Sequence, residues 1–161
     1  MIELIVVLML WIHNITGYSI PEPPVIKYMS SYDIKAYSFG CNLDIIPEEN
    51  IEVCESSEFW DLDKIGPIAL YDHELKTIIL NNDFDINTVH DKSVLFHELV
   101  HHMQYENGKR SEVECIGILE KEAYELQDRW LQETYDVTLW DTIPINKMFF
   151  VLLTTCMTPG L

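Results

Sequence analysis

The sequence contains few basic residues, only 10 lysines and arginines against 27 aspartates and glutamates, so its formal net charge is -17. A surface of this sign repels phosphate backbones and anionic lipid head groups. The composition therefore argues against nucleic acids and anionic membrane surfaces as partners, and it leaves neutral and basic partners open.

The chain also lacks a C-x-x-C motif, internal repeats, low-complexity stretches and any apolar run long enough to cross a bilayer. Without a C-x-x-C motif, neither a zinc ribbon nor a thioredoxin-like redox site is indicated. Apolar residues nevertheless make up 48% of the chain and charged residues 23%, a balance typical of a folded globular protein. A length of 161 residues is enough for one domain with its own hydrophobic core.

An apolar run occupies residues 1–12, which is too short for a transmembrane helix of about 20 residues. It matches the hydrophobic region of a secretory signal peptide, with Gly17 and Ser19 as small residues where cleavage could occur. The start of the run contains the acidic Glu3 and no basic residue, which is atypical of such a leader. We expect residues 1–19 to be a signal peptide and residues 20–161 to form a single domain that is secreted or periplasmic, with no membrane span once the leader is removed. A buried first strand or helix of a cytosolic domain is the alternative.

The four cysteines are an even number, which suits two disulfides in an oxidising compartment. Cys41 and Cys54 are close in sequence across a turn-rich segment and form the expected first pair. Cys115 and Cys156 form the second, which would join a helix to the apolar segment 148–157, expected to be a buried terminal element. Four buried free thiols are the alternative.

The first half of the chain is expected to hold short β-strands. Residues 21–66 mix short apolar runs with Pro, Ser, Asn and acidic residues, a pattern of short strands or a short helix separated by loops. Two β-rich runs at residues 67–71 and 75–80 flank a polar turn and predict a β-hairpin.

Two helices are expected after the hairpin. The first begins near residues 88–93 and ends at Asn107-Gly108, a pair suited to a helix C-terminus. The second starts at Ser111, which can form a capping box with Glu114, and continues to about Glu133. Its apolar stripe is expected to lie in the core and comprises Leu119, Leu126 and Trp130.

The first helix contains His97-Glu-Leu-Val-His101, an H-E-x-x-H motif. Because four residues advance a helix by about one turn, both imidazoles project from one face and can chelate one Zn²⁺. Glu98 is then close enough to reach a water beside the metal without binding the metal, as a general base of hydrolysis does. A pair of core or surface histidines with local hydrogen bonds is the alternative. Because apolar residues surround the motif, the histidines need a partner, and this favours a metal.

A catalytic zinc takes three protein ligands and a water, so a third ligand is expected on the second helix. Glu122 is favoured because its neighbours at three and four positions include Ile118, Leu119 and Leu126, which place it on a largely apolar face. A carboxylate buried there needs a partner, which a metal supplies. Glu120 is the competing candidate.

The motif from His97 to Gln104, followed by Glu122 on the next helix, resembles the gluzincin arrangement of zinc metallopeptidases. In that family an H-E-x-x-H helix supplies two ligands and a glutamate on the next long helix supplies the third. The resemblance covers residues 67–133 and is closest to small, poorly characterised bacterial proteins that keep only this minimal core. It implies an α+β, zincin-like fold in which a short β-hairpin or sheet packs on the H-E-x-x-H helix and on a second long helix.

The resemblance also implies zinc-dependent hydrolysis of peptide bonds in a peptide or protein substrate. His97, His101 and Glu122 would be the metal ligands, and Glu98 would be the general base. A non-catalytic zinc-binding or protein-binding domain that keeps the same fold is an alternative, and its large negative charge would suit a basic partner. A cytosolic four-cysteine helical domain with an accidental H-E-x-x-H motif is a third hypothesis.

The resemblance says less about how the substrate binds and which residue stabilises the oxyanion. The strand Lys76–Leu80 would be the edge along which an extended peptide binds. A tyrosine or histidine must stabilise the developing oxyanion, and Tyr105, Tyr124 and Tyr135 are the candidates.

Overall fold

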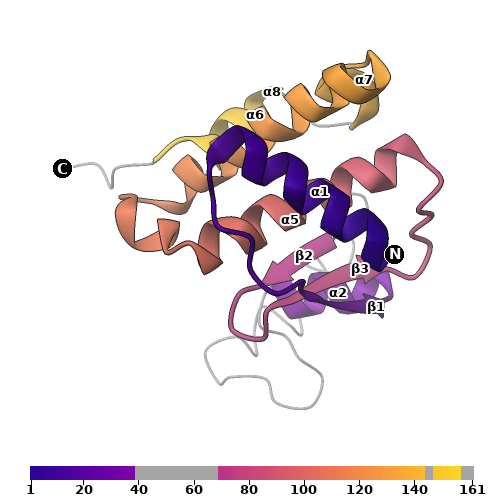
Figure 1. Cartoon of the computed structure of the whole chain (residues 1–161). Helices are drawn as coiled ribbons and strands as arrows, with labels where there is room; N and C mark the ends of the chain where they lie inside the picture. The colour runs from indigo at the N-terminus through magenta and orange to yellow at the C-terminus, as the bar shows by residue number, and fades with distance from the viewer. Residues whose placement is uncertain (39–68, 144–146, 157–161) are drawn as a thin grey trace, which may run out of the picture. The chain divides into compact units, whose positions relative to one another are not determined.

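The computed structural model of the chain describes residues 1–38, 69–143 and 147–156 (Figure 1). The chain divides into two compact units, a helical unit (Met1–Pro24 with Asp85–Leu161) and a sheet unit (Val25–Phe84). Helices and a small sheet are thus both present, and the expected α+β class is confirmed.

The sheet unit contains three strands in the order β1–β3–β2 (Figure 1). β2 (Ala69–Asp72) and β3 (Thr77–Asn81) form the expected antiparallel hairpin, and β1 (Val25–Met29) pairs in parallel with the other side of β3. α2 (Ser31–Ser38) follows β1 and packs on the strands through the buried Ile34. The strand and the short helix both fall in the region where the sequence predicts such elements.

The central position of β3 shows that one expectation from the sequence is wrong. The strand Lys76–Leu80 is predicted as an edge along which a peptide could bind, but β3 is paired on both sides. β1 takes the side that an isolated hairpin would leave open, and such a parallel pairing across a long crossover leaves no local signal in the sequence.

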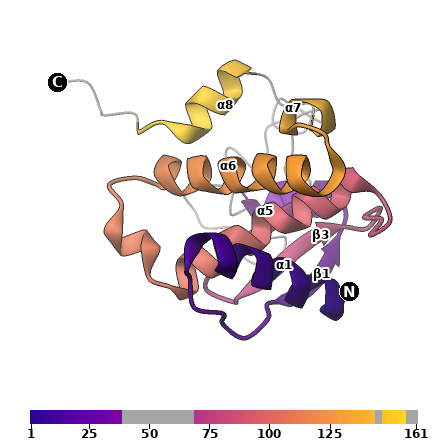
Figure 2. The same ribbon diagram turned by 45° about the horizontal axis from the view of Figure 1, so that its top comes forward.

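The helical unit is built around α5 (Val89–Glu106) and α6 (Ile116–Tyr135), which lie side by side (Figure 2). α1 (Ile2–Thr16) packs on α5, while α8 (Lys147–Thr154) and the short α7 (Leu139–Thr142) pack on α6. The apolar stripe of α6 lies in the core as expected. The ring of Trp130 in this stripe stacks on Phe96 of α5, with 5.0 Å between ring centroids.

α5 begins and ends where the sequence predicts, whereas α6 begins later than predicted. Thr88 Oγ1 accepts a hydrogen bond from the N–H of Asp91 at 3.0 Å, and Gly108 ends the helical segment with φ of 73°. The capping box predicted at Ser111 is wrong, because this residue lies in the 3₁₀ segment η2 (Lys109–Glu112) and its hydroxyl donates to the carbonyl of Gly108. A tight turn therefore precedes α6.

The apolar N-terminal run forms α1, and its buried residues face α5. Trp11 contacts Phe96 edge to face, with 5.4 Å between ring centroids. The assignment of residues 1–19 as a signal peptide stays a prediction. In the described part of the chain, every helix is too short or too polar to cross a membrane.

The predicted disulfide between Cys115 and Cys156 is confirmed and joins the start of α6 to the residues after α8. The predicted Cys41–Cys54 pair lies outside the described residues. The expectation that the C-terminal apolar segment is buried is wrong for much of α8, since Met148 is 71% exposed and Val151 is 54% exposed. α8 packs on α6, and the disulfide joins the residues after α8 to the start of α6.

Candidate metal centre

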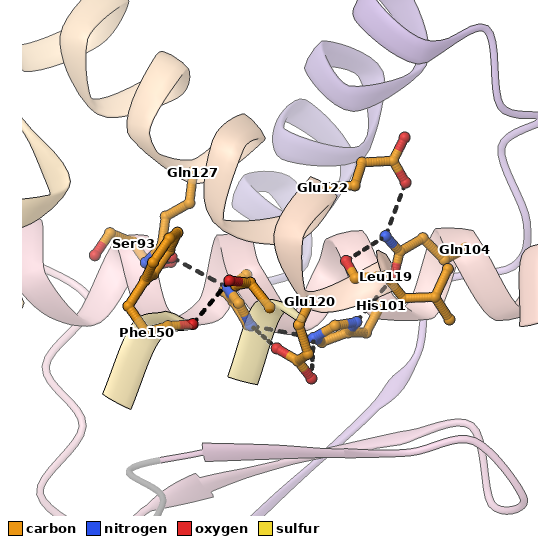
Figure 3. Close-up of polar contacts among 10 residues, drawn as sticks. Ser93, His101, Gln104, Leu119, Glu120, Glu122, Gln127 and Phe150 are labelled. Carbon is orange, nitrogen blue, oxygen red and sulfur yellow. Dashed lines mark hydrogen bonds and ion pairs between the residues drawn. The ribbon is translucent and has the colours of Figure 1, made fainter. Parts of the chain in front are cut away.

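Two imidazoles and one carboxylate converge between α5 and α6. His97 and His101 project from successive turns of α5, and Glu120 reaches them from the second turn of α6. The two Nε2 atoms are 3.1 Å apart, and each lies 3.3 Å from an oxygen of Glu120. Figure 3 shows the carboxylate of Glu120 beside the imidazole of His101.

The donor atoms of these three residues lie close enough together to bind one metal ion. Zinc binds nitrogen and oxygen ligands at about 2.0–2.2 Å in a tetrahedral arrangement, which places the ligand atoms about 3.3 Å from one another. The two Nε2 atoms are 3.1 Å apart, Nε2 of His97 lies 3.3 Å from Oε2 of Glu120, and Nε2 of His101 lies 3.3 Å from Oε1, so each pair is close to that value. His97, His101 and Glu120 could therefore hold a metal ion.

The structure brings Glu120 to the imidazoles rather than Glu122, the residue that the sequence favours. Two residues along a helix rotate a side chain by about 200°, so these two glutamates cannot share a face. The neighbours of Glu122 suggested burial, but Ile118 is 42% exposed. The helical neighbours of Glu120 at three positions are instead the small residues Gly117 and Ala123, both buried.

Glu122 has a different set of partners. Its carboxylate accepts hydrogen bonds from the hydroxyl of Tyr18 at 2.7 and 2.8 Å and from Nε2 of Gln104 at 2.8 Å. Burial and the hydrogen bond to Glu122 raise the pKa of Tyr18, so this hydroxyl stays a donor. Glu122 is thus fixed by two donors, away from the imidazole nitrogens.

Opposite charges face each other at the site. Burial lowers the pKa of His101, but the hydrogen bond and charge of Glu120, together with the charge of Glu98, outweigh burial and raise this pKa to about 9. Burial acts to raise the pKa of Glu120, but the two imidazoles hold it well below its usual range. Without a metal, His101 is therefore the cation that balances the carboxylate of Glu120.

Glu98, the predicted general base, is buried, with 9% of its surface exposed. It lies next to His97 on α5, and its negative charge contributes to the raised pKa of both His101 and Tyr124. The structure therefore places this carboxylate in the electrostatic environment of the three converging side chains, and on a rigid helix rather than a loop.

The ring of Tyr124, one of the three candidate tyrosines, packs on a converging imidazole. Its ring centroid lies 4.4 Å from that of His97. Burial, followed by the charges of Glu120 and Glu98, raises the pKa of Tyr124, so its hydroxyl remains protonated at neutral pH. Tyr135 instead contacts Trp130, with 5.4 Å between ring centroids.

Two buried glutamines contact the imidazoles and were not identified from the sequence. Nδ1 of His101 lies 2.9 Å from Oε1 of Gln104, and Nδ1 of His97 lies 3.1 Å from Oε1 of Gln127 (Figure 3). Gln104 follows His101 by three positions on α5, a spacing that could have indicated the contact. Gln127 lies on α6, so its contact depends on how the two helices pack, which the sequence does not reveal.

Comparison with known proteins relates the chain to one family. Residues 45–158 match a family described as a domain of unknown function (DUF6647), and the matched part includes α5, α6 and all of the converging side chains. No curated protein and no solved structure matches the chain. Because the match covers more than half of the chain, the protein belongs to the DUF6647 family.

Proposed function

We propose that this protein is a zinc metallopeptidase of the gluzincin type, which hydrolyses peptide bonds. The proposal depends on one observation, the convergence of His97, His101 and Glu120 with Nε2 and carboxylate oxygens 3.1–3.3 Å apart. Two histidines and one glutamate are a ligand set of catalytic zinc, and the H-E-x-x-H spacing adds Glu98 beside it. The paired helices α5 and α6 support a zincin-like core.

Zinc held by these ligands would polarise the scissile carbonyl and lower the pKa of a bound water to about 7. Glu98 would accept a proton from the attacking water and deliver it to the leaving nitrogen. Tyr124 would donate its hydroxyl hydrogen to the carbonyl oxygen, where negative charge develops. Each of these roles is assigned to a residue of α5 or α6, so the packing of two helices defines the reaction geometry.

We further propose that the protein works in a secreted or periplasmic compartment. The Cys115–Cys156 disulfide supports this location, because disulfides persist where the environment is oxidising. The mass of the protein recovered from outside the cytoplasm would test the leader assignment directly. Loss of residues 1–19 is expected, and an exported protein with an intact Met1 would contradict it.

The experiment that tests the activity compares Glu98→Gln with the wild type and with Glu125→Gln. Glu125 is a matched control because its carboxylate lies on α6 and is 65% exposed. We expect the wild type and Glu125→Gln to bind zinc and to cleave members of a diverse peptide library. Glu98→Gln should bind zinc equally well and lose cleavage, because the ligands remain and the base is removed.

Two results would contradict the proposal in different ways. A wild-type chain that binds zinc but cleaves no peptide would favour a non-catalytic zinc-binding or protein-binding domain. A chain that binds no zinc would show that the H-E-x-x-H motif is not a metal site.

A further inference from the structure

Each of the two imidazoles at the candidate metal centre touches the side-chain oxygen of a fully buried glutamine. Gln104 and Gln127 have no exposed surface, and each bridges α5 and α6. Buried amide groups are almost always hydrogen-bonded, and their partners determine which end of the amide faces which neighbour. The other hydrogen-bond partners of these two amides therefore determine which nitrogen of each imidazole carries the hydrogen.

The orientation of Gln127 is set by the backbone of α5. Its Nε2 lies 2.8 Å from the carbonyl oxygen of Ser93, which can only accept a hydrogen bond (Figure 3). The amide nitrogen must therefore point to Ser93, and Oε1 must point to His97. Since Oε1 can only accept, the hydrogen in this contact belongs to Nδ1 of His97.

The same reasoning applies to Gln104, with stronger restraint. Its Nε2 lies 2.9 Å from the carbonyl oxygen of Leu119 and 2.8 Å from Oε2 of Glu122, and both of these atoms are acceptors. Both amide hydrogens are thus used, and Oε1 is left to face Nδ1 of His101 at 2.9 Å. The hydrogen in this contact belongs to Nδ1 of His101.

We propose that Gln104 and Gln127 are positioning residues that hold both imidazoles with a hydrogen on Nδ1, so that Nε2 of each ring is the atom presented to the metal. This inference deepens the proposed zinc site and rests on it. A neutral imidazole can carry its single hydrogen on either nitrogen, and only the nitrogen without it can bind a metal. An acceptor fixed at Nδ1 selects the tautomer and the ring orientation that binding requires.

Glu122 has a defined role in this arrangement. It accepts a hydrogen bond from Nε2 of Gln104, so it anchors the amide that faces His101. Glu122 therefore acts on His101 through Gln104 and is not itself a ligand. Two acidic residues of α6 thus contribute to one site: Glu120 as a metal ligand, and Glu122 through its hydrogen bond with Gln104.

The affinity for zinc tests the inference without a substrate. Gln104→Met and Gln127→Met keep the side-chain volume and remove the acceptor, and each is expected to weaken zinc binding by about 10–100-fold in competition with a chelating dye. Gln132→Met is the matched control, because Gln132 is exposed on the same helix as Gln127, and it should bind zinc as tightly as the wild type. Methionine variants that keep wild-type affinity would overturn the inference and leave the zinc site intact.

Nitrogen-15 NMR of the zinc-loaded wild type provides a second readout, independent of whether the variants fold. Both His97 and His101 are expected to show a protonated Nδ1 and a zinc-bound Nε2. Zinc bound through Nδ1 of either ring would overturn the inference even though the metal site stands. A wild type that binds no zinc would overturn the proposed function and this inference together, which distinguishes the two failures.

Discussion

Glu120 and Glu122 show what a sequence can and cannot say about a single residue. The spacing of His97 and His101 defines a shared face within one helix, so the sequence identifies these two residues correctly as neighbours. The choice between the glutamates depends on which face of α6 meets α5. Large apolar residues such as Ile118, which is 42% exposed, lie partly outside the core. Side-chain hydrophobicity was therefore a poor guide to the side of contact.

At the same scale, we predict that Tyr124→Phe keeps zinc and lowers kcat by about 100-fold, because one donor to the developing oxyanion is lost. The phenylalanine ring should keep its contact with His97, so the KM for a cleaved peptide should change little. Steady-state kinetics on a peptide from the library measures both parameters. Tyr135→Phe is the control, since its ring packs on Trp130. Unchanged kcat in Tyr124→Phe would remove this residue from the mechanism.

Caps and turns in the sequence predict the helices and strands well, but they predict the contacts between these elements poorly. The cap at Thr88 and the turn at Gly108 fix the length of α5, and both can be read from the sequence. The hairpin β2–β3 is equally local, but the pairing of β1 with β3 joins residues far apart in the chain. The same limit applies to the contact between Gln127 and His97.

Gly117 shows how closely α8 approaches α6. A Cβ atom at this position would lie 2.9 Å from the carbonyl oxygen of Thr155 and 3.1 Å from that of Leu153. We predict that Gly117→Ala destabilises the fold by about 1–3 kcal/mol, because the clash with backbone outweighs the helix propensity of alanine. Urea unfolding measures the change, and Ile118→Ala at the exposed neighbouring position should change stability by less. A Gly117→Ala variant as stable as the wild type would show that α8 does not lie against this residue.

The hairpin turn of the sheet unit provides a pH-dependent prediction. Burial tends to raise the pKa of Asp72, but hydrogen bonds from Tyr37 and from the N–H groups of Leu75 and Glu74 lower it below the ordinary value. A lowered pKa in the folded state contributes stability above the ordinary carboxyl pKa of about 3.9, and this contribution is lost as the pH falls below it.

Asp72→Asn is therefore expected to destabilise the protein at neutral pH. The expected loss is only about 1 kcal/mol, because solvent screens this partly exposed carboxylate. The difference from the wild type should shrink in acid, where Asp72 itself becomes protonated. Urea unfolding at neutral and acidic pH measures both values, with the exposed Asp83→Asn as control. A difference that is equal at both pH values would contradict the role of the charged carboxylate.

For the whole molecule, composition gives an expectation about the charge of a partner but does not identify one. A net charge of -17 disfavours polyanionic partners, but it does not identify a substrate. The α+β class and the Cys115–Cys156 disulfide follow from elements and spacing that the sequence displays. The identity of the third side chain at the candidate metal centre depends on the packing of α6 on α5, which turns Glu120 and not Glu122 toward the imidazoles.

The central claim is that His97, His101 and Glu120 hold one zinc ion. Metal analysis after exhaustive dialysis, made on the wild type, Glu120→Gln and Glu122→Gln, tests it most directly. We predict one equivalent of zinc in the wild type and in Glu122→Gln, whose amide oxygen can still accept from Gln104, and loss of zinc from Glu120→Gln, because of these two glutamates it is Glu120 that brings its oxygens to the imidazole nitrogens. Zinc retained by Glu120→Gln and lost from Glu122→Gln, or zinc absent from the wild type, would contradict the claim.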